Sequence, residues 1–233
     1  MFENIIKNVH NRHPLIHCIT NYVSINDCAN IVLACGGAPI MAEDINEVSQ
    51  ITSICQGLDI NIGMLNDNKL SSMLKAGATA NELGIPVILD PVGAGSSDYR
   101  IKAVQNLMSN VQFGVIRGNV SEIKAIAAKQ GIHNIAAGVY ETMQKNKSAM
   151  GVEAGIADKI TDDNIKEMAD FINKLSQKTG AVIAVTGGID MVADENRVYA
   201  IRNGHKMMSL VTGAGCQLSA LTSAYVAADK EHI

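Results

Sequence analysis

Short apolar segments alternate along the chain with segments whose apolar residues recur at helical spacing, and this alternation restricts the fold most. The clearest strand pattern is Pro86-Val-Ile-Leu-Asp90. Similar short runs, each predicted to be a strand, cover residues 15–19, 38–41, 58–62, 114–117 and 181–186. Predicted helices cover residues 2–9, 24–36, 45–55, 70–83, 98–109, 121–130 and 161–180. Strands that alternate with helices form parallel sheets covered on both faces. We therefore predict an α/β fold with a mostly parallel central sheet.

Two further elements complete the predicted order. Residues 191–193 and 198–201 flank Asp194-Glu195-Asn196 and are predicted to form a β-hairpin, and a final apolar helix begins near Cys216. The chain has 233 residues, 47% of them hydrophobic but only 3% aromatic, with no Trp. A core of Ile, Val, Leu, Ala and Met suits strands buried on both faces. We expect one domain over residues 1–233.

Charge and cysteine content exclude several functional classes. The net charge is −4 and no long basic run is present, which argues against a nucleic-acid partner. The five cysteines follow no metal-binding or disulfide spacing, which favours a reducing compartment. The N-terminus lacks a signal-peptide pattern, and the longest apolar run, residues 31–42, is too short to span a bilayer. We expect a cytoplasmic protein without membrane partners.

A glycine-rich segment, Thr212-Gly-Ala-Gly-Cys216, opens the final helix. Backbone N–H groups at such a helix start converge on anions, so phosphate is the natural ligand. No Lys-Ser or Lys-Thr follows, so the segment is not a Walker P-loop. Cys216 at the helix start has the position of a thiol with a lowered pKa, suited to a base or nucleophile. A turn that merely starts a helix, with a buried structural cysteine, is the alternative.

Two further segments carry polar residues at strand ends. Arg117-Gly-Asn-Val-Ser-Glu122 follows a strand, and Asn119 and Glu122 face the same point over the first turn of the next helix. An amide and a carboxylate there suit Mg²⁺ and its waters, with Arg117 beside phosphate oxygens. Helix capping by Asn119 or Ser121 is the alternative. Asp90 ends a buried strand, at the edge where open parallel sheets bind ligands, and a turn capped by Asp90 is the alternative there.

The strand ends near the N-terminus should reach the same edge. They carry Asn21, Met41 and Asn61. Met41 beside a ligand suits an aromatic, sulfur-containing molecule. Each of these residues is alone compatible with an ordinary turn or core position. We group them as candidate site residues because all of them lie at strand ends.

These segments, in this order, resemble the hydroxyethylthiazole kinase family. The stretches that carry the resemblance are Pro14-Leu-Ile-His-Cys-Ile-Thr-Asn-Tyr-Val23, Ala38-Pro-Ile-Met-Ala42, Leu58-Asp-Ile-Asn-Ile-Gly63, Pro86-Val-Ile-Leu-Asp-Pro-Val-Gly-Ala-Gly95, Val115-Ile-Arg-Gly-Asn-Val-Ser-Glu-Ile123, Val185-Thr-Gly187 and Val211-Thr-Gly-Ala-Gly-Cys216. The resemblance implies a ribokinase-like three-layer fold. It implies ATP- and Mg²⁺-dependent phosphorylation of 4-methyl-5-(2-hydroxyethyl)thiazole on its primary alcohol. It also implies a homotrimer with active sites at subunit interfaces.

The resemblance also assigns roles to residues. Residues Gly213, Ala214, Gly215 and Cys216 would form the catalytic turn, in which Cys216 stands where related sugar kinases carry an aspartate base. The thiazole would contact Met41, Gly213, Asn21 and Asp90. The nucleotide would contact Arg117, Asn119 and Thr186. Glu122 and Asp90 would belong to the magnesium network.

Four features depart from the family pattern. Cys18 replaces a usual Asn, and Ala214 replaces a Thr. Residues 131–154, with a predicted helix near Tyr140, lengthen a connection that is usually short. The chain ends at Ile233, where the family continues with more helix, so we expect a C-terminally shortened domain.

Three other functions remain as alternatives. One is a related vitamin kinase that acts on hydroxymethylpyrimidine, and another is a non-catalytic protein that binds thiazole. A Rossmann-type oxidoreductase is less favoured, because no Gly-x-Gly-x-x-Gly follows the first strand.

Overall fold

The computed structural model describes residues 2–132 and 159–229, and these form two compact units. The first unit takes in residues 2–90, 107–114 and 207–229 of the described chain, and the second takes in the others. Nearly all of the predicted insertion at 131–154, with the predicted helix near Tyr140, lies outside the described residues. The single domain 1–233 stays a prediction. In the two described ranges no helix has the length and apolarity needed to cross a membrane.

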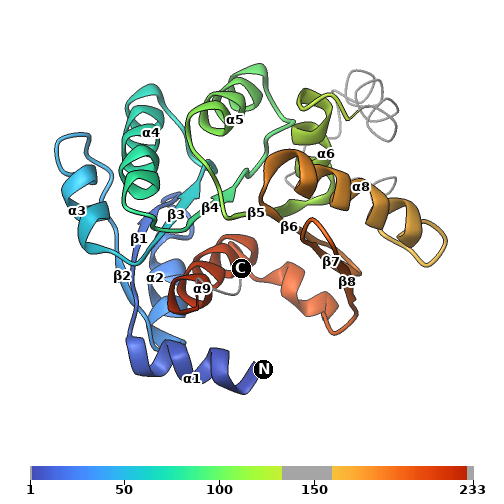
Figure 1. The fold of residues 1–233 in the computed structure, drawn as a ribbon, viewed down its shortest axis with the longest axis horizontal. Coiled ribbons are helices and arrows are strands. Elements are labelled where there is room, and N and C mark those ends of the chain that lie inside the picture. Colours follow the sequence, from blue (N-terminus) through green and yellow to red (C-terminus); the bar gives the residue numbers. More distant parts are fainter. Residues whose placement is uncertain (1, 133–158, 230–233) are drawn as a thin grey trace. The chain divides into compact units, whose positions relative to one another are not determined.

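A parallel sheet forms the centre of the first unit (Figure 1). Its strands lie in the order β2 (Ala38–Ile40), β1 (Leu15–Ile19), β3 (Gly57–Asn61) and β4 (Val87–Asp90). All four were predicted, with ends that differ by at most one residue. Every residue of β3 and β4 is buried, as strands covered on both faces require. Asn61 pairs with Asp90, so the carboxyl ends of β3 and β4 are level.

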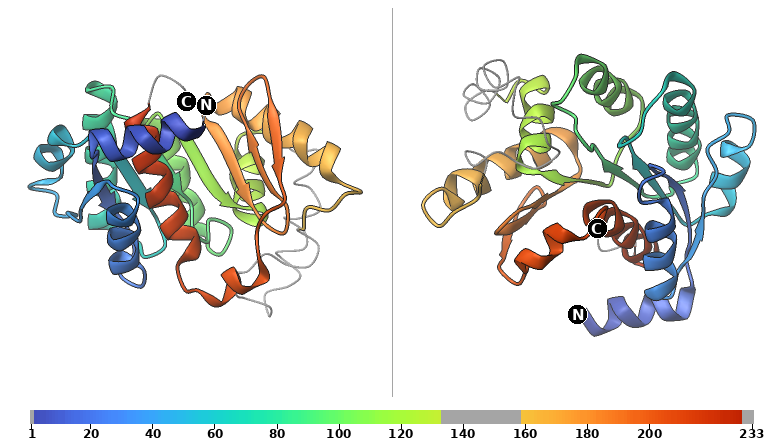
Figure 2. Two further views of the ribbon diagram at one scale, coloured as in Figure 1. Left: turned by 90° about the horizontal axis from the view of Figure 1, so that it is seen from below. Right: turned by 180° about the vertical axis from the view of Figure 1, so that it is seen from behind.

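Helices cover both faces of this sheet (Figures 1 and 2). On one face α9 (Ala214–Ala228) packs on β1, β3 and β4 and contacts α1 (Phe2–Arg12) and α2 (Ile25–Ala34). On the other face lie α3 (Val48–Ile54) and α4 (Asp67–Glu82). The side chain of Arg12 donates a hydrogen bond to the carbonyl oxygen of Ala228 at 2.6 Å, which ties α1 to the end of α9. A short 3₁₀ helix, η2 (Lys206–Leu210), precedes α9.

The second unit contains a mixed sheet. Strand β5 (Val115–Asn119) runs parallel to β6 (Val182–Thr186), and β6 pairs with the hairpin of β7 (Asp190–Ala193) and β8 (Val198–Ile201). Helix α6 (Val120–Lys129) packs on β5 and β6, and α8 (Ile165–Thr179) packs on β6 and β7. Helix α5 (Asp98–Asn110) begins in this unit. The predicted hairpin is confirmed, and Asn119 pairs with Thr186 at the carboxyl ends of β5 and β6.

Helix starts differ most from the prediction. Helix α8 begins at Ile165 rather than at Thr161, because the side chain of Asn164 accepts the Thr161 N–H at 2.8 Å and closes a turn first. Helix α3 likewise begins at Val48 rather than at residue 45, since the Asp44 carboxylate accepts the Asn46 N–H at 2.8 Å. Both cases are local side-chain turns that compete with the helix.

Candidate active site

The carboxyl ends of β1, β3 and β4 bring three buried polar side chains together. The Asn61 amide donates to Asp90 Oδ2 at 2.9 Å, and the Asn21 amide donates to Asn61 Oδ1 at 3.2 Å. Asp90 and Asn61 have no exposed surface, and Asn21 is 6% exposed. Parallel strands in register place their carboxyl ends at one edge, which is the ligand-binding edge of open α/β sheets. The predicted gathering of strand ends is therefore confirmed for the first unit.

The first turn of α9 joins this cluster. Cys216 and Ser219 are three residues apart and so share one face of the helix. The Ser219 hydroxyl donates to Asp90 Oδ2 at 2.9 Å, and the Asn21 amide donates to Cys216 Sγ at 3.2 Å. We call Asn21, Asn61, Asp90, Cys216 and Ser219 the strand-end network. It fixes the start of α9 against the edge of the parallel sheet.

Gly213 is required at the start of α9 for two reasons. Its φ is 72°, in the left-handed region that favours glycine. A Cβ on Gly213 would also lie 2.6 Å from the Cβ of Ser24. Ser24 in turn donates through its N–H and its hydroxyl to Asn21 Oδ1, both at 3.1 Å. The glycine therefore lets the turn before α9 approach the strand-end network closely.

Amides in the first turn of α9 retain the predicted capacity to bind an anion. The first intrahelical bond runs from the Gln217 N–H to the Gly213 carbonyl at 2.9 Å. The N–H groups of Gly215 and Cys216 precede it and have no acceptor within the helix. The N–H of Ala214 donates to the Val211 carbonyl at 3.3 Å, so it is already used. Helix N-termini also carry partial positive charge, which favours phosphate oxygens.

The pKa of Cys216 is raised, and the expected lowering at a helix start is not found. Burial is the largest cause, and the negative charge of Asp90 adds to it. Polar contacts of the sulfur with the side chains of Ser24, Asn61 and Asn21 oppose these effects without overcoming them. The side chain is therefore a protonated thiol at neutral pH and a weak base.

Arg117 and Thr186 meet in the second unit. Arg117 lies at the third position of β5 rather than at the strand end, which corrects the predicted strand boundary. Its guanidinium reaches forward and donates to Thr186 Oγ1 at 2.7 Å. The side chain of Arg117 is only 8% exposed. Two of the three residues that the resemblance assigns to the nucleotide thus lie in direct contact.

Glu122 and Asn119 form a capping box at the start of α6. Asn119 Oδ1 accepts the Glu122 N–H at 2.9 Å, and Glu122 Oε2 accepts the Asn119 N–H at 2.8 Å. Glu122 Oε1 accepts the N–H of Gly93 at 2.8 Å. The capping alternative is therefore confirmed, and the carboxylate additionally fixes the glycine turn that follows β4.

The donor set for a magnesium ion is modest. Among residues 2–132 and 159–229, no group of three or more His, Cys, Asp or Glu side chains lies close enough to hold a metal. Mg²⁺ is commonly bound through one or two carboxylates, with phosphates and waters as the other ligands. Glu122 and Asp90 supply carboxylate oxygens, which are the donor type that Mg²⁺ takes from proteins. The residues present are therefore compatible with Mg²⁺ that arrives with a nucleotide.

Ser219 was missed from the sequence, and Asn61 was grouped with the other strand ends but received no role of its own. Asn61 ends β3, and Ser219 follows Cys216 by one helical turn. Those two positions were the available signals. Met41 directly follows β2 at the same strand edge and is partly buried, as expected.

Replacing Asp90 by Asn should lower the pKa of the Cys216 thiol, because the substitution removes a negative charge that raises it. The amide oxygen of Asn can still accept from Asn61 and Ser219, so the network should persist. Iodoacetamide reacts with the thiolate, and its rate against pH, followed by mass spectrometry of the Cys216 peptide, reports this pKa. The inflection should move to lower pH in Asp90→Asn and stay in place in Asp67→Asn, an exposed control. An unmoved inflection in Asp90→Asn would contradict the coupling.

Comparison with known proteins gives the family. Residues 6–233 match the model described as the hydroxyethylthiazole kinase family. The hydroxyethylthiazole kinase of Clostridium acetobutylicum is 52% identical over 229 residues, which cover 98% of this chain and 78% of that protein. The Desulfovibrio desulfuricans hydroxyethylthiazole kinase is 44% identical over 95% of this chain and 72% of its own length.

Comparison with solved structures supports the same family. The hydroxyethylthiazole kinase of Pyrococcus horikoshii superposes with a TM-score of 0.80 at 33% identity, over 96% of this chain and 75% of that one. Phosphomethylpyrimidine kinase from Clostridium difficile has a TM-score of 0.58 at 14% identity over 91% of this chain and 90% of its own, which supports the fold alone. The predicted ribokinase-like α/β fold is therefore confirmed, and the chain belongs to the hydroxyethylthiazole kinase family.

Proposed function

We propose that this protein transfers the γ-phosphoryl group of ATP to the primary alcohol of 4-methyl-5-(2-hydroxyethyl)thiazole. The alcohol oxygen forms a bond to the γ-phosphorus, the bond from that phosphorus to the β–γ bridging oxygen breaks, and the alcohol proton is lost. ADP and the thiazole phosphate are the products. The observation that supports this most directly is the strand-end network, which holds the start of α9 at the ligand edge of the sheet in a chain of this family.

Residues of the first unit would bind the thiazole alcohol and the γ-phosphoryl group that is transferred to it. The amides of Gly215 and Cys216 would stabilise the charge that spreads over the γ-phosphate oxygens during transfer. Met41, Gly213 and Asn21 would contact the thiazole, with Asp90 fixing the orientation of Asn61. The catalytic turn proposed from the sequence, residues 213–216, keeps this role, except that the Ala214 N–H is already bonded to Val211.

Residues of the second unit would bind the nucleotide. Arg117, Asn119 and Thr186 would contact ATP, with Arg117 neutralising phosphate charge. Mg²⁺, when bound, supplies charge neutralisation for the phosphates of ATP. Glu122 and Asp90 are the residues that would hold it. Both carboxylates also have structural hydrogen bonds, which keep them in one orientation.

Proton removal from the alcohol would depend little on Cys216. Its raised pKa keeps it a neutral thiol, which is a poor proton acceptor. Positioning and electrostatic stabilisation should therefore supply most of the acceleration. A homotrimer with interfacial active sites and a cytoplasmic location stay predictions of the family resemblance.

A coupled assay of ADP release tests the reaction. Hydroxyethylthiazole with ATP and Mg²⁺ should give ADP, and omission of Mg²⁺ should abolish the signal. Hydroxymethylpyrimidine in place of the thiazole should give little ADP, and a preference for it would favour the rival vitamin kinase. Calorimetric binding of thiazole without ADP formation would instead favour a non-catalytic thiazole-binding protein.

Cys216→Ala should lower kcat without abolishing nucleotide binding. General acid–base groups commonly contribute 10²- to 10⁴-fold, and a neutral thiol should contribute far less. Alanine also removes the sulfur that accepts a hydrogen bond from Asn21, so we expect a decrease of about 10-fold. Steady-state kinetics gives kcat, and fluorescence titration with a labelled ATP analogue gives nucleotide affinity. An unchanged kcat would remove Cys216 from the mechanism.

Glu122→Gln should weaken the dependence of the rate on Mg²⁺. The half-saturating Mg²⁺ concentration should rise about 10-fold, the lower end of the effect of losing a group that orients or binds a metal. The glutamine keeps one acceptor oxygen but turns an NH₂ group towards Gly93 or Asn119. Glu122→Asp, which keeps the charge, serves as the control for that structural effect. A magnesium titration identical to that of the wild type would count against Glu122.

A further inference from the structure

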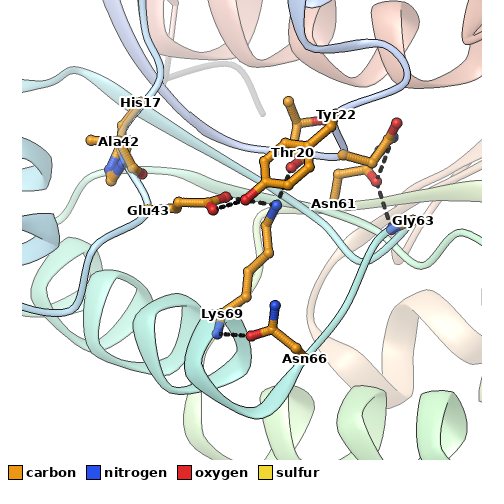
Figure 3. A network of polar contacts seen from close by, with 10 residues as sticks. His17, Thr20, Tyr22, Ala42, Glu43, Asn61, Gly63, Asn66 and Lys69 are labelled. Atoms are coloured by element: carbon orange, nitrogen blue, oxygen red, sulfur yellow. Dashed lines mark hydrogen bonds and ion pairs between the residues drawn. The ribbon is translucent and has the colours of Figure 1, made fainter.

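Lys69, in the first turn of α4, is a buried cation with several partners. Its side chain is 3% exposed, and its Nζ lies 2.8 Å from Glu43 Oε2. The same nitrogen donates to the carbonyl oxygen of Thr20 and lies 4.6 Å from the centre of the Tyr22 ring. Figure 3 shows the lysine side chain extending from α4 towards these groups. An ammonium group is costly to bury unless it is paired and hydrogen-bonded, so this arrangement fixes its partners as well as the lysine.

The partners Thr20, Tyr22 and Glu43 of Lys69 each lie within two residues of a residue proposed to contact the substrate. Thr20 immediately precedes Asn21, which binds both Asn61 and Cys216 through its amide. Glu43 lies two residues after Met41. Lys69 therefore connects the segments that follow β1 and β2. Its own backbone is fixed too, because Asn66 Oδ1 accepts the Lys69 N–H at 2.9 Å as the cap of α4.

Glu43 remains a charged partner at neutral pH. Burial alone would raise the pKa of this carboxyl, but hydrogen bonds from Lys69 and from the Tyr22 hydroxyl outweigh that effect and lower it. The Tyr22 hydroxyl donates to Glu43 Oε1, so the two carboxylate oxygens have different donors. Loss of the lysine would leave a partly buried carboxylate and the Thr20 carbonyl without their cation.

His17 holds the same segment from another direction. Its Nε2 lies 2.7 Å from the Ala42 carbonyl oxygen, which can only accept, so the proton is on Nε2. Its Nδ1 lies 2.9 Å from Thr52 Oγ1. Burial lowers the pKa of His17, so the ring is neutral at neutral pH. His17 contacts only the backbone of the segment, and Lys69 adds the charged contact at Glu43, as Figure 3 shows.

We propose that Lys69 is a positioning residue for the alcohol substrate, acting through Asn21 and Met41. This inference rests on the proposed phosphorylation of hydroxyethylthiazole. Lys69 holds Thr20 and Glu43 at fixed places and thereby sets where the two neighbouring substrate contacts lie. The residues proposed to contact ATP, namely Arg117, Asn119 and Thr186, belong to the other unit. Replacement of Lys69 should therefore change the KM for thiazole rather than the KM for ATP.

Lys69→Met tests the proposal, with Lys75→Met as the matched control. Lys75 is an exposed lysine of the same helix, and its Nζ donates at 2.9 Å to the carbonyl of Ile45, in the same segment as Glu43. In Lys69→Met the KM for thiazole should rise about 10-fold, which is less than the roughly 10²-fold loss that a 1 Å displacement of a positioned group can cause. The KM for ATP should change less than about twofold, and Lys75→Met should match the wild type in both constants.

Glu43→Gln provides a second variant, because Lys69→Met can fail to fold. The glutamine keeps the size and one acceptor but removes the charge that faces Lys69. Its thiazole KM should rise in the same direction, by a smaller factor than in Lys69→Met. The double variant should be no worse than Lys69→Met, since both remove one interaction. Circular dichroism and thermal unfolding identify variants that are folded.

The outcomes separate this inference from the proposed function. Folded variants with an unchanged thiazole KM, or with equal increases in both KM values, would overturn the positioning role of Lys69. A wild-type protein that forms no ADP from thiazole would overturn the proposed reaction instead. In that case the calorimetric Kd for thiazole in wild type, Lys69→Met and Lys75→Met still decides the role of Lys69. Weaker binding confined to Lys69→Met would support it, and equal affinities would refute it.

Discussion

The carboxylate of Asp90 at the end of β4 is the contact on which the first unit depends. Its Oδ2 accepts from Asn61, on the neighbouring strand, and from Ser219, on α9. One buried oxygen therefore joins the edge of the sheet to the helix whose first turn carries Gly213 and Cys216. Hydrogen bonds to charged acceptors are roughly twice as strong as neutral ones, which suits a contact that must hold a helix start in place. The negative charge of Asp90 also raises the pKa of Cys216 and so opposes ionisation of the thiol.

Glu122 plays a comparable part in the second unit. Its two oxygens accept from Gly93, just after β4, and from Asn119, at the start of α6. A buried carboxylate would be unfavourable without such donors. In each unit the carboxylate, Asp90 or Glu122, thus accepts hydrogen bonds from groups that lie far apart in sequence. These bonds set the orientation of the carboxylate before any ligand binds. A site with its charges already oriented avoids the cost of reorganising them during the reaction.

The sequence predicted the strands well and their chemical partners less well. Strands β1 to β4 are short, mostly apolar runs, and all but β2 are largely buried, so their ends were predicted within one residue. Helix starts were harder, since side-chain turns at Asp44 and Asn164 compete with the helix locally. For Cys216 the sequence left a thiol of lowered pKa and a buried cysteine as alternatives, and the raised pKa favours the second. Sequence could not decide between them, because burial and the charge on Asp90 are tertiary effects. The pairing of Arg117 with Thr186 spans 69 residues of sequence, and no local pattern identifies it.

Lys69 shows why a buried charged residue of this kind cannot be identified from the sequence. A single lysine in the first turn of a helix is ordinarily a solvated side chain, and only the fold brings Thr20, Tyr22 and Glu43 around it. Replacement of buried ion pairs by apolar residues is often neutral or even stabilising in other proteins, so stability is weak grounds for retaining this one. A fixed arrangement of the residues beside Asn21 and Met41 is a stronger reason. The charged contact restricts those segments to one geometry, which apolar packing alone would specify less strictly.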